Sequence, residues 1–449
     1  MVLSPLQASP EDYSLLTDLY QLTMSACYVG EGIDQRQASF ELFARRLPPN
    51  FGYLIAMGLT QAVEYLQAFV ISDRHLDQLQ ATGIFHQAPD AFWETLSNAR
   101  FTGNVWAVPE GTAIFANEPL LRVEAPLWQA QVVETYLLNV LNYQTLIATR
   151  AARMRNLVGS DAKLLEFGTR RAFSPQGAMW AARAALAGGF DGTSNVLAAL
   201  QLGQKPTGTM AHALVMAIAA LAGSETDAFA AFHRYFPGAP LLIDTYDTVA
   251  AARHLAAQRQ QGQTGLAGVR LDSGDLVRLS RQVRELLPDV PIFASGDIDE
   301  YEIARLKTAE AAIDGYGLGT RLVTGTPVNG VYKLVDINGT PVMKESANKV
   351  TYPGRKQIFR QFEGAVAVKD WLGLATEAPP DGAQPLLQLV MQQGQLMTKL
   401  ETLSAIAQRT AQSVASLPPD VGRVQDPSPY NVNITPELDK LTQATRQQT

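Results

Sequence analysis

Polar and charged residues follow short apolar segments at five places between residues 166 and 297 of this 449-residue chain. Each group contains Gly, Asp, Arg or His and precedes a segment with helical periodicity. In a parallel α/β sheet, the carboxyl ends of successive strands lie at one edge, where ligands and catalytic groups gather. The spacing therefore predicts an enzyme that handles phosphate groups. The five groups are Glu166–Arg171, Gly208–Ala213, Leu242–Asp247, Val269–Asp275 and Ala294–Asp297.

His212 is the histidine whose position predicts chemistry. It lies where an apolar segment gives way to a predicted helix, whereas the other four histidines lie in polar helical or loop segments. Asp244 ends the next predicted strand and is placed to orient the imidazole, as a carboxylate commonly does. A lone histidine after an apolar strand is also common as a buried structural residue, so both interpretations stay open here.

Arg270 and Asp272 alternate on one predicted strand, so their side chains share a face. A guanidinium suits phosphate because it offers two parallel donors and stays charged. The aspartate suits ribose hydroxyls or magnesium. A salt bridge at the rim of the sheet is the alternative for this pair.

Two glycine-containing pairs suit a phosphate cradle. Gly296-Asp297 and Gly319-Thr320 both end apolar segments. Backbone amides can approach an anion closely where no side chain intervenes. Either pair alone would more often form a turn.

Composition limits the class of protein. Hydrophobic residues make up 47% and charged residues 18% of the chain, as in ordinary globular proteins. The net charge of −7 argues against nonspecific binding to nucleic acid or membranes, so arginines must meet any anionic ligand locally. Cys27 is the one cysteine, which fits a reducing compartment. The first residues lack a signal pattern and the apolar run 210–222 is too short to span a bilayer, so we expect a cytoplasmic protein.

Residues 126–326 have a repeating strand–helix pattern. A strand about every 25–35 residues with a helix between predicts parallel pairing, and so many units favour closure into a barrel. An open doubly wound sheet is the alternative, which the lack of a G-x-G-x-x-G segment after a strand disfavours. The predicted strands are Leu164–Phe167, Phe190–Thr193, Thr207–Met210, Leu241–Asp244, Ala267–Leu271, Pro291–Ser295 and Gly315–Leu318.

The regions on either side, residues 1–125 and 327–449, are predicted to form one flanking α/β domain around the barrel. A helical pattern from Pro126 to about Leu157 leads into the barrel. Asn338-Gly339 is a strong hairpin signal. Other expected elements are a helix over Tyr13–Tyr28, a strand over Gln37–Ala44, short strands within Asn104–Glu124, a loop over Ala375–Gln384 and a helix over Leu386–Val414.

Nine segments in this order resemble the nicotinate phosphoribosyltransferase family, and the resemblance covers nearly the whole chain. One such segment would be weak, but the ordered set is specific. The segments are Thr17–Met24, Phe40–Phe43, Leu127–Gln131, Glu166–Arg171, Gly192–Asn195, Gly208–His212, Leu271–Asp275, Gly317–Thr320 and Lys349–Gly354.

The resemblance implies an irregular seven-stranded α/β barrel of the type II phosphoribosyltransferase kind, with an α/β domain built from both termini. It implies a homodimer with shared active sites. The implied reaction joins nicotinate to 5-phosphoribosyl 1-pyrophosphate (PRPP), giving nicotinate mononucleotide and pyrophosphate. ATP hydrolysis, with Mg2+, is coupled through a phosphohistidine at His212.

The resemblance also implies how the substrate ring is held. Phe167 would stack on the pyridine ring, Arg170 would contact substrate, and Tyr20 would cover the ring from the partner subunit. A core phenylalanine, a surface arginine and a packing tyrosine are the alternatives. Because the pyridine nitrogen is already a free nucleophile, the reaction needs positioning and electrostatic stabilisation but no general base.

Ser194 separates the main function from its nearest alternative, a nicotinamide phosphoribosyltransferase. That related family has a carboxylate at this position to pair with a carboxamide, whereas a hydroxyl can donate to nicotinate. Quinolinate phosphoribosyltransferases are shorter and lack the His212 motif. A phosphosugar aldolase would need a strand-end lysine or metal cluster, which the sparse lysines and scattered histidines do not supply. A binding module without catalysis is disfavoured because every expected site position is intact.

Overall fold

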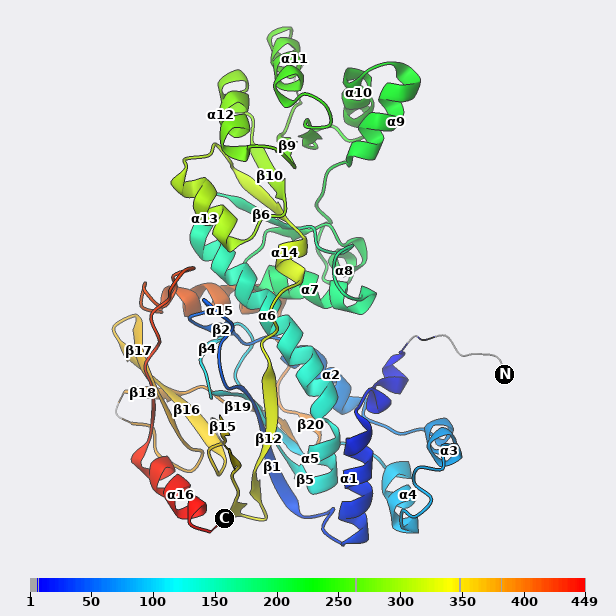
Figure 1. Cartoon of the computed structure of the whole chain (residues 1–449), viewed down its shortest axis with the longest axis vertical. Coiled ribbons are helices and arrows are strands. Elements are labelled where there is room, and N and C mark those ends of the chain that lie inside the picture. The colour runs from blue at the N-terminus through cyan, green and yellow to red at the C-terminus, as the bar shows by residue number, and fades with distance from the viewer. Residues whose placement is uncertain (1–5, 7, 263–264, 347–348, 381, 449) are drawn as a thin grey trace. The chain divides into compact units, whose positions relative to one another are not determined.

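The computed structural model describes residues 6, 8–262, 265–346, 349–380 and 382–448. The chain divides into two compact units (Figure 1). The first unit consists of residues 1–146 and 327–449, and the second of residues 147–326. Helix α6 (Glu134–Val158) contributes residues to both units. The boundary expected at residue 126 stays a prediction.

A parallel sheet is the centre of the second unit. Its strands are short and mostly buried, and their order is β7-β6-β11-β10-β9-β8. All five neighbouring pairs run parallel, as the strand–helix alternation predicts. The strands are β6 (Lys163–Glu166), β7 (Gly192–Thr193), β8 (Leu241–Leu242), β9 (Val269–Leu271), β10 (Ile292–Gly296) and β11 (Gly315–Leu318).

Polar N-cap residues mark where most helices of the second unit begin. Asp247, Asp275 and Asp299 each accept hydrogen bonds from backbone amides in the first turn of their helix. This capping fixes where each loop stops. The helices are α7 (Pro175–Ala187), α8 (Val196–Gln201), α9 (His212–Ala222), α10 (Glu225–Tyr235), α11 (Thr248–Gln260), α12 (Leu276–Leu286), α13 (Glu300–Thr308) and α14 (Thr320–Val323).

The strand expected over Thr207–Met210 is wrong. This segment is irregular, because Pro206 lacks an amide donor and Gly208 weakens strand geometry. One backbone hydrogen bond, from the Thr207 N–H to the Thr193 carbonyl at 2.9 Å, still ties it to β7. The described sheet therefore has six strands, and closure into a seven-stranded barrel is not part of it.

The first unit contains an antiparallel sheet of seven strands in the order β13-β12-β1-β5-β3-β19-β20. Strand β1 lies inside this sheet between β12 and β5 and is buried along nearly its whole length. The strands are β1 (Gln37–Ala44), β3 (Asn104–Ala107), β5 (Pro119–Pro126), β12 (Gly330–Ile337), β13 (Thr340–Pro341), β19 (Gln388–Gln392) and β20 (Gln395–Leu396). Its N-terminal helices are η1 (Pro10–Leu15), α1 (Leu19–Gly30), α2 (Leu59–Gln67), α3 (Asp73–Ala81), α4 (Asp90–Ser97) and α5 (Leu127–Val132).

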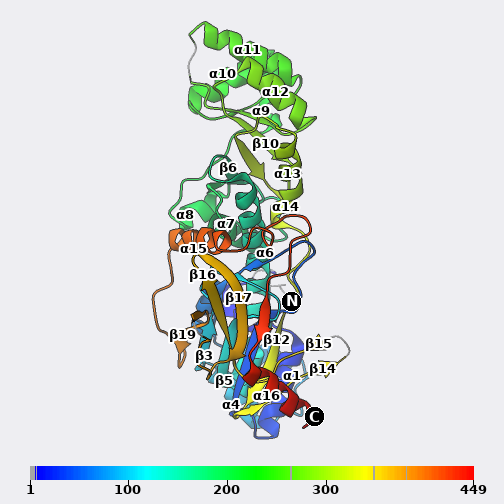
Figure 2. The same cartoon turned by 90° about the vertical axis from the view of Figure 1, so that its left-hand side faces the viewer.

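A four-stranded sheet completes the first unit, in the order β18-β16-β17-β21. Figure 2 shows its long central pair, β16 and β17, side by side. Its strands are β16 (Lys356–Glu363), β17 (Val366–Leu374), β18 (Ala383–Pro385) and β21 (Val432–Ile434). The remaining elements are the strand pairs β2 (Leu54–Ile55) with β4 (Ala113–Ile114) and β14 (Glu345–Ser346) with β15 (Lys349–Val350), and the helices α15 (Leu403–Ala415) and α16 (Pro436–Arg446).

Several predicted elements of the first unit are confirmed. The strand Gln37–Ala44 is β1 with the same bounds, and the short strands within 104–124 and the long helical segment after Pro126 are present. Asn338 and Gly339 adopt φ values of 55° and 79°, which the turn between β12 and β13 requires. Strands replace the expected loop or helix at β18, β19 and β20, near the C-terminal end of the described residues.

Two predicted helices are wrong in extent. Tyr13–Tyr28 is interrupted between η1 and α1, where Asp18 caps α1 with extended backbone. Leu386–Val414 is helical only in α15, because residues 388–396 form the β19–β20 hairpin with Gln393 and Gly394 at positive φ. Within the described residues, no single helix is long and apolar enough to cross a membrane, although one bent pair, α9 with α10, has the required length and composition.

A buried cluster of charges lies inside the first unit. The Arg360 guanidinium donates to both carboxylate oxygens of Asp370, with Nη2–Oδ2 at 2.6 Å. Glu118 is also completely buried, and its Oε1 has no hydrogen-bond partner among the described residues. Burial and the neighbouring Asp370 raise the pKa of Glu118 well above its usual range. The folded protein therefore binds a proton at Glu118 more tightly than the unfolded chain does.

Glu118→Gln tests this linkage. The stability that Glu118 contributes is present below the unfolded pKa and is lost as pH rises through the raised folded pKa. The amide does not titrate and can donate to Asp370, so it should increase the unfolding free energy by about 1–3 kcal/mol near pH 8. The gain should vanish near about pH 4. Urea unfolding at both pH values measures it, with Glu363→Gln at the exposed end of β16 as control; equal gains at both pH values would contradict the linkage.

Candidate active site

A cavity of about 1030 Å³ opens at the carboxyl ends of the strands in the second unit. Its walls come from the segments that follow β6, β7, β9, β10 and β11, and from the irregular segment 206–211. Nine of the residues predicted for the site line it. They are Phe167, Arg170, Ser194, Arg270, Asp272, Gly296, Asp297, Gly319 and Thr320.

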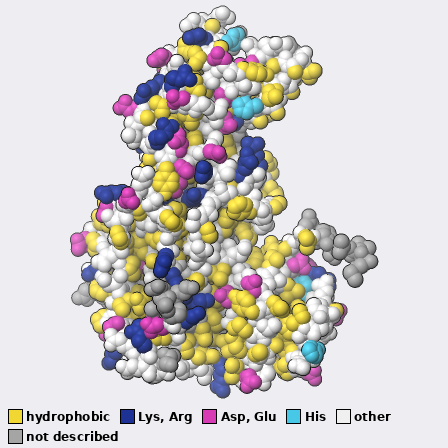
Figure 3. Space-filling model, in the orientation of Figure 1, with side chains coloured by type: hydrophobic (Ala, Val, Ile, Leu, Met, Phe, Trp, Pro, Cys, Tyr) yellow, Lys and Arg dark blue, Asp and Glu magenta, His cyan; other side chains and the backbone are white. Residues whose placement is uncertain are grey.

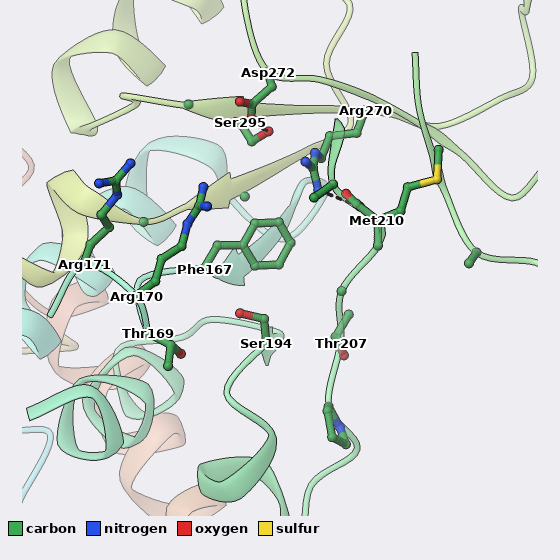
Figure 4. Close-up of a pocket in the computed structure, with 18 of the residues that line it drawn as sticks. Phe167, Thr169, Arg170, Arg171, Ser194, Thr207, Met210, Arg270, Asp272 and Ser295 are labelled. Atoms are coloured by element: carbon green, nitrogen blue, oxygen red, sulfur yellow. Dashed lines mark hydrogen bonds between the residues drawn. The ribbon is translucent and has the colours of Figure 1, made fainter. Parts of the chain in front are cut away.

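Phe167 lies in the centre of this cavity, with Ser194 on one side and Arg270 on the other (Figure 4). The Arg270 guanidinium carbon is 6.0 Å from the centre of the Phe167 ring. Gly317 makes room for the ring, because a Cβ there would lie 2.6 Å from Phe167 Cδ2. The arrangement offers a flat apolar surface between a hydroxyl and a cation, which suits a planar ring with an anionic substituent.

Arg270 alternates with buried Val269 and Leu271 on β9, so its side chain projects from the opposite face of the strand into the cavity. Its Nη1 donates to Thr209 Oγ1 at 2.6 Å. Burial lowers the pKa of Arg270, while Asp272 and Asp244 oppose that shift, and the group stays charged. An anionic ligand would relieve the cost of burying this cation.

Asp272 and Gly296 form the part of the wall that suits a sugar phosphate. Ser295 Oγ donates to Asp272 Oδ1 at 2.5 Å, which orients the carboxylate. Gly296 has φ of 113°, and a Cβ on it would lie 2.7 Å from the Asp272 carbonyl oxygen. Only glycine fits this close approach of two loops. Gly319 is similar, since its Cβ would lie 3.0 Å from the Phe167 carbonyl oxygen.

His212 and Asp244 lie next to the cavity wall but do not line it. His212 is the first residue of α9, and its side chain is 38% exposed. Its Nδ1 lies 3.1 Å from Thr245 Oγ1, whereas its Nε2 lies 3.9 Å from Asp244 Oδ1. The hydrogen bond that holds the imidazole thus involves Thr245, and the expected carboxylate partner is at ion-pair distance.

Asp244 connects the histidine to the cavity. Its Oδ2 accepts from the Asp272 N–H and from Ser273 Oγ, both at 2.8 Å. Its Oδ1 is buried without a hydrogen-bond partner among the described residues. The Asp244 carboxylate therefore bonds to the loop that carries Asp272 and also faces the imidazole of His212.

Tyr20 is not brought to this cavity. It lies on α1 in the first unit, where its hydroxyl donates to Glu134 Oε2 at 3.3 Å. Glu134 Oε2 also accepts from Gln21 Nε2 at 2.7 Å. The Tyr20 residue remains 47% exposed. Its predicted contact with substrate is therefore not part of the described site.

Several lining residues escaped sequence reasoning. Thr209 and Ser295 sit inside the predicted motifs and orient Arg270 and Asp272, so their position beside those residues was a usable signal. Arg171 adds a third cation to the cavity. Phe232 and Phe236 come from α10 and its C-terminal end, where nothing in the local sequence points to a ligand.

A resident metal site is not formed by the described part of the chain. No three His, Cys, Asp or Glu side chains there group in a way that could hold a metal ion. Mg2+ usually binds through one or two carboxylates together with substrate phosphates. Asp272 and Asp297, both on the cavity wall, fit that second kind of binding.

The parallel sheet with a glycine-lined, cationic cavity at its carboxyl edge places the protein in the class of α/β enzymes that act on phosphorylated ligands. Comparison with known proteins narrows the class. Residues 15–142 match the nicotinate phosphoribosyltransferase N-terminal domain, residues 162–361 the nicotinate phosphoribosyltransferase family, and residues 375–442 the nicotinate phosphoribosyltransferase C-terminal domain. The chain therefore belongs to the nicotinate phosphoribosyltransferase family of enzymes.

Individual relatives align with this chain over nearly their full length. A nicotinate phosphoribosyltransferase of Mycobacterium tuberculosis is 40% identical, with 96% of this chain and 94% of the relative covered. That of Bacillus subtilis is 38% identical, with 95% and 93% covered. The crystal structure of human nicotinic acid phosphoribosyltransferase superposes with a TM-score of 0.83 at 31% identity, over 95% of this chain and 99% of the human one.

Proposed function

We propose that this protein joins nicotinate to PRPP, releasing nicotinate mononucleotide and pyrophosphate for NAD biosynthesis. The observation that carries the proposal is the placement of Phe167 between Ser194 and Arg270 in a cavity that also contains Asp272 and Gly296. The first group suits a pyridine carboxylate, and the second suits a ribose phosphate. Family membership supports the same reaction.

In this reaction the pyridine nitrogen attacks C1 of the ribose as the C1–oxygen bond breaks. The electron pair of that bond leaves on pyrophosphate, so no proton has to move. Phe167 and Ser194 hold the ring, while Arg270 and Arg170 face the anionic groups. The Asp272 carboxylate, oriented by Ser295, suits the ribose hydroxyls and the positive charge that develops at C1. Mg2+ bound with PRPP, held by Asp272 and Asp297, would neutralise the leaving pyrophosphate.

Ser194 sets the preference for nicotinate over nicotinamide. Replacing it by aspartate places a like charge against the substrate carboxylate in a partly dehydrated pocket. Ser194→Asp should lower kcat/KM for nicotinate by about 10-fold to 1000-fold, the range expected for loss of a hydrogen bond plus repulsion. Product formation from each base with PRPP measures this, with Thr169→Asp at an exposed lining position as the control. Equal use of both bases by the unmodified protein would refute the assignment.

His212 is the residue through which ATP hydrolysis is coupled to the transfer. An imidazole nitrogen attacks the γ-phosphorus of ATP, ADP leaves, and water later hydrolyses the N–P bond. The position of His212 at the first turn of α9 supports this role, because a helix N-terminus favours an added phosphate. Thr245 holds the imidazole ring by a hydrogen bond, and Asp244 faces the ring.

His212→Asn should abolish ATP hydrolysis stimulated by nicotinate and remove the phosphoenzyme. Slow synthesis without ATP should persist at high PRPP, since the groups that hold the substrates are unchanged. Phosphate release and mass spectrometry of the acid-labile phosphopeptide measure these outcomes. His233→Asn, on α10 of the same unit, is the matched control. Unchanged ATP coupling in the His212 variant, or phosphate on another residue, would overturn this role.

The assembly and the finer fold belong to the same proposal. A homodimer with shared sites is supported by exposed apolar side chains on α8, α9 and α10; Figure 3 shows such side chains over α9 and α10. Closure into an irregular barrel also stays a proposal, supported by the bonds that tie the irregular segment 207–210 to β7 through Thr207 and to β9 through Arg270. The flanking domain built from both termini and the cytoplasmic location stay predictions.

Shared sites predict complementation between two inactive variants. If Tyr20 of one chain covers the ring bound by its partner, Tyr20→Ala and Arg270→Ala should each be inactive alone. After subunit exchange at equal amounts, about one quarter of the sites combine both native residues, so about a quarter of the activity should return. A mixture of Arg270→Ala with Asp272→Ala, both from one cavity, should stay inactive. No recovery after verified exchange would rule out sharing.

A further inference from the structure

Glu166, the last residue of β6, is a fully buried acid that the proposed reaction does not use. Its Oε1 accepts a hydrogen bond from the Gly168 N–H, and its Oε2 accepts one from Thr193 Oγ1. No basic side chain pairs with it within the described ranges. Burial raises the pKa of Glu166, and the two donors oppose that shift.

The hydrogen bonds of Glu166 reach both segments that face the substrate ring. Thr193 Oγ1 accepts from the Asn195 N–H at 2.9 Å, so its own hydrogen is free to point to Glu166. The Ser194 N–H donates to the main-chain carbonyl of Glu166, also at 2.9 Å. Glu166 therefore holds Thr193 through its side chain and Ser194 through its main chain, and Asn195 is tied to the same point through the Thr193 hydroxyl.

The second carboxylate oxygen of Glu166, Oε1, is packed closely against Gly168. A Cβ on Gly168 would lie 2.8 Å from Glu166 Oε1 and would overlap Val323. The Phe167 N–H donates to the Leu318 carbonyl at 2.7 Å, which fixes the start of the segment. The carboxylate thus reaches the Gly168 amide only because no side chain intervenes, and this contact sets the direction in which residues 167–171 leave the strand.

Stability alone gives a poor account of this acid. A buried carboxylate without a cation is costly, and an apolar or neutral residue of similar size would usually be at least as stable. The carboxylate accepts one hydrogen bond from each of the two segments that face the substrate ring, from the Gly168 N–H and from the Thr193 hydroxyl. These bonds indicate that Glu166 serves to position the two segments. Polar groups that are fully hydrogen-bonded in a low-dielectric interior make an arrangement rigid and unique.

We infer that Glu166 is a positioning residue that locks the Phe167–Arg171 segment to the Thr193–Asn195 segment, so that one rigid unit presents Phe167 and Ser194 to the nicotinate ring. The inference rests on the proposed function for the identity of the ring. It assigns Glu166 no contact with substrate. Loosening the lock should weaken capture of the ring far more than it weakens PRPP binding, because the proposed sugar-phosphate contacts at Asp272 and Gly296 lie at the ends of β9 and β10 and not on the locked segments.

The test compares Glu166→Gln, Thr193→Val and Thr193→Ser by steady-state kinetics with each substrate varied. Glutamine keeps the shape but turns one acceptor into a donor facing another donor, and valine removes the hydroxyl. Both variants should raise KM for nicotinate by about 10-fold or more, the loss expected for a charge-assisted hydrogen bond, with KM for PRPP within about 2-fold. Thr193→Ser retains the hydroxyl and should stay within about 3-fold of the native protein.

Glu300→Gln is the matched control, because Glu300 is a buried acid of the same unit that lies outside the cavity lining and faces Arg153. It should lower stability without changing the ratio of the two KM values. Unchanged KM for nicotinate in Glu166→Gln and Thr193→Val, or equal changes for both substrates, would overturn the inference. If Glu166→Gln fails to fold, the Thr193 pair decides. Failure of the native protein to make nicotinate mononucleotide would instead refute the proposed function.

Discussion

The parallel register of four neighbouring strands is the constraint on which the site depends. Glu166 of β6 lies opposite Leu318 of β11, and Leu318 in turn lies opposite Gly296 of β10. Ala294 of β10 lies opposite Leu271 of β9. The strands therefore end almost level with one another. The residues that follow, among them Phe167, Gly319, Asp297 and Asp272, enter one cavity without needing long loops to bring them there.

Close approach of these loops places strict demands on residue size. A Cβ at Gly296, Gly317 or Gly319 would meet a neighbouring loop at 3.0 Å or less. The Phe167 ring and backbone carbonyls occupy the space that a side chain at these glycines would take. The same close packing explains why charged groups can be buried here: Arg270 donates to Thr209 on an adjacent segment, and Glu166 accepts from Thr193 on the adjacent strand β7.

The sequence predicted the site well where its signal is periodic and local. Arg270 and Asp272 could be found because alternation on a strand fixes which side chains share a face, and six of seven strands were found by their apolar character. Contacts that depend on the path of a turn could not be found. Thr245 rather than Asp244 bonds the His212 ring because the turn after β8 points the hydroxyl at it. Phe232 and Phe236 come from a helix beyond the sheet, whose direction no local pattern encodes.

The helix and the strand that were wrongly predicted also depend on contacts between segments that are distant in the sequence. Apolar residues over 387–396 are compatible with either a helix or a hairpin, and the choice depends on pairing between β19 and β3, which are far apart in the sequence. Thr207–Met210 has strand-like residues, yet Thr209 holds Arg270, so only the first part of the segment pairs with its neighbour. In both places tertiary contacts override the local preference.

Asp244 shows how the two chemistries proposed for this protein can influence each other. Its carboxylate holds the backbone of Asp272 through Oδ2, while its free Oδ1 lies 3.9 Å from His212 Nε2. A phosphate on His212 would bring two negative charges close to this buried carboxylate, and the repulsion would act on the loop that Asp244 holds. Because that loop also carries Asp272 into the cavity, a change of charge at the histidine reaches the substrate groups through a single side chain. The coupling needs no rearrangement of the sheet, since the bonds involved lie in the short segments after β8 and β9.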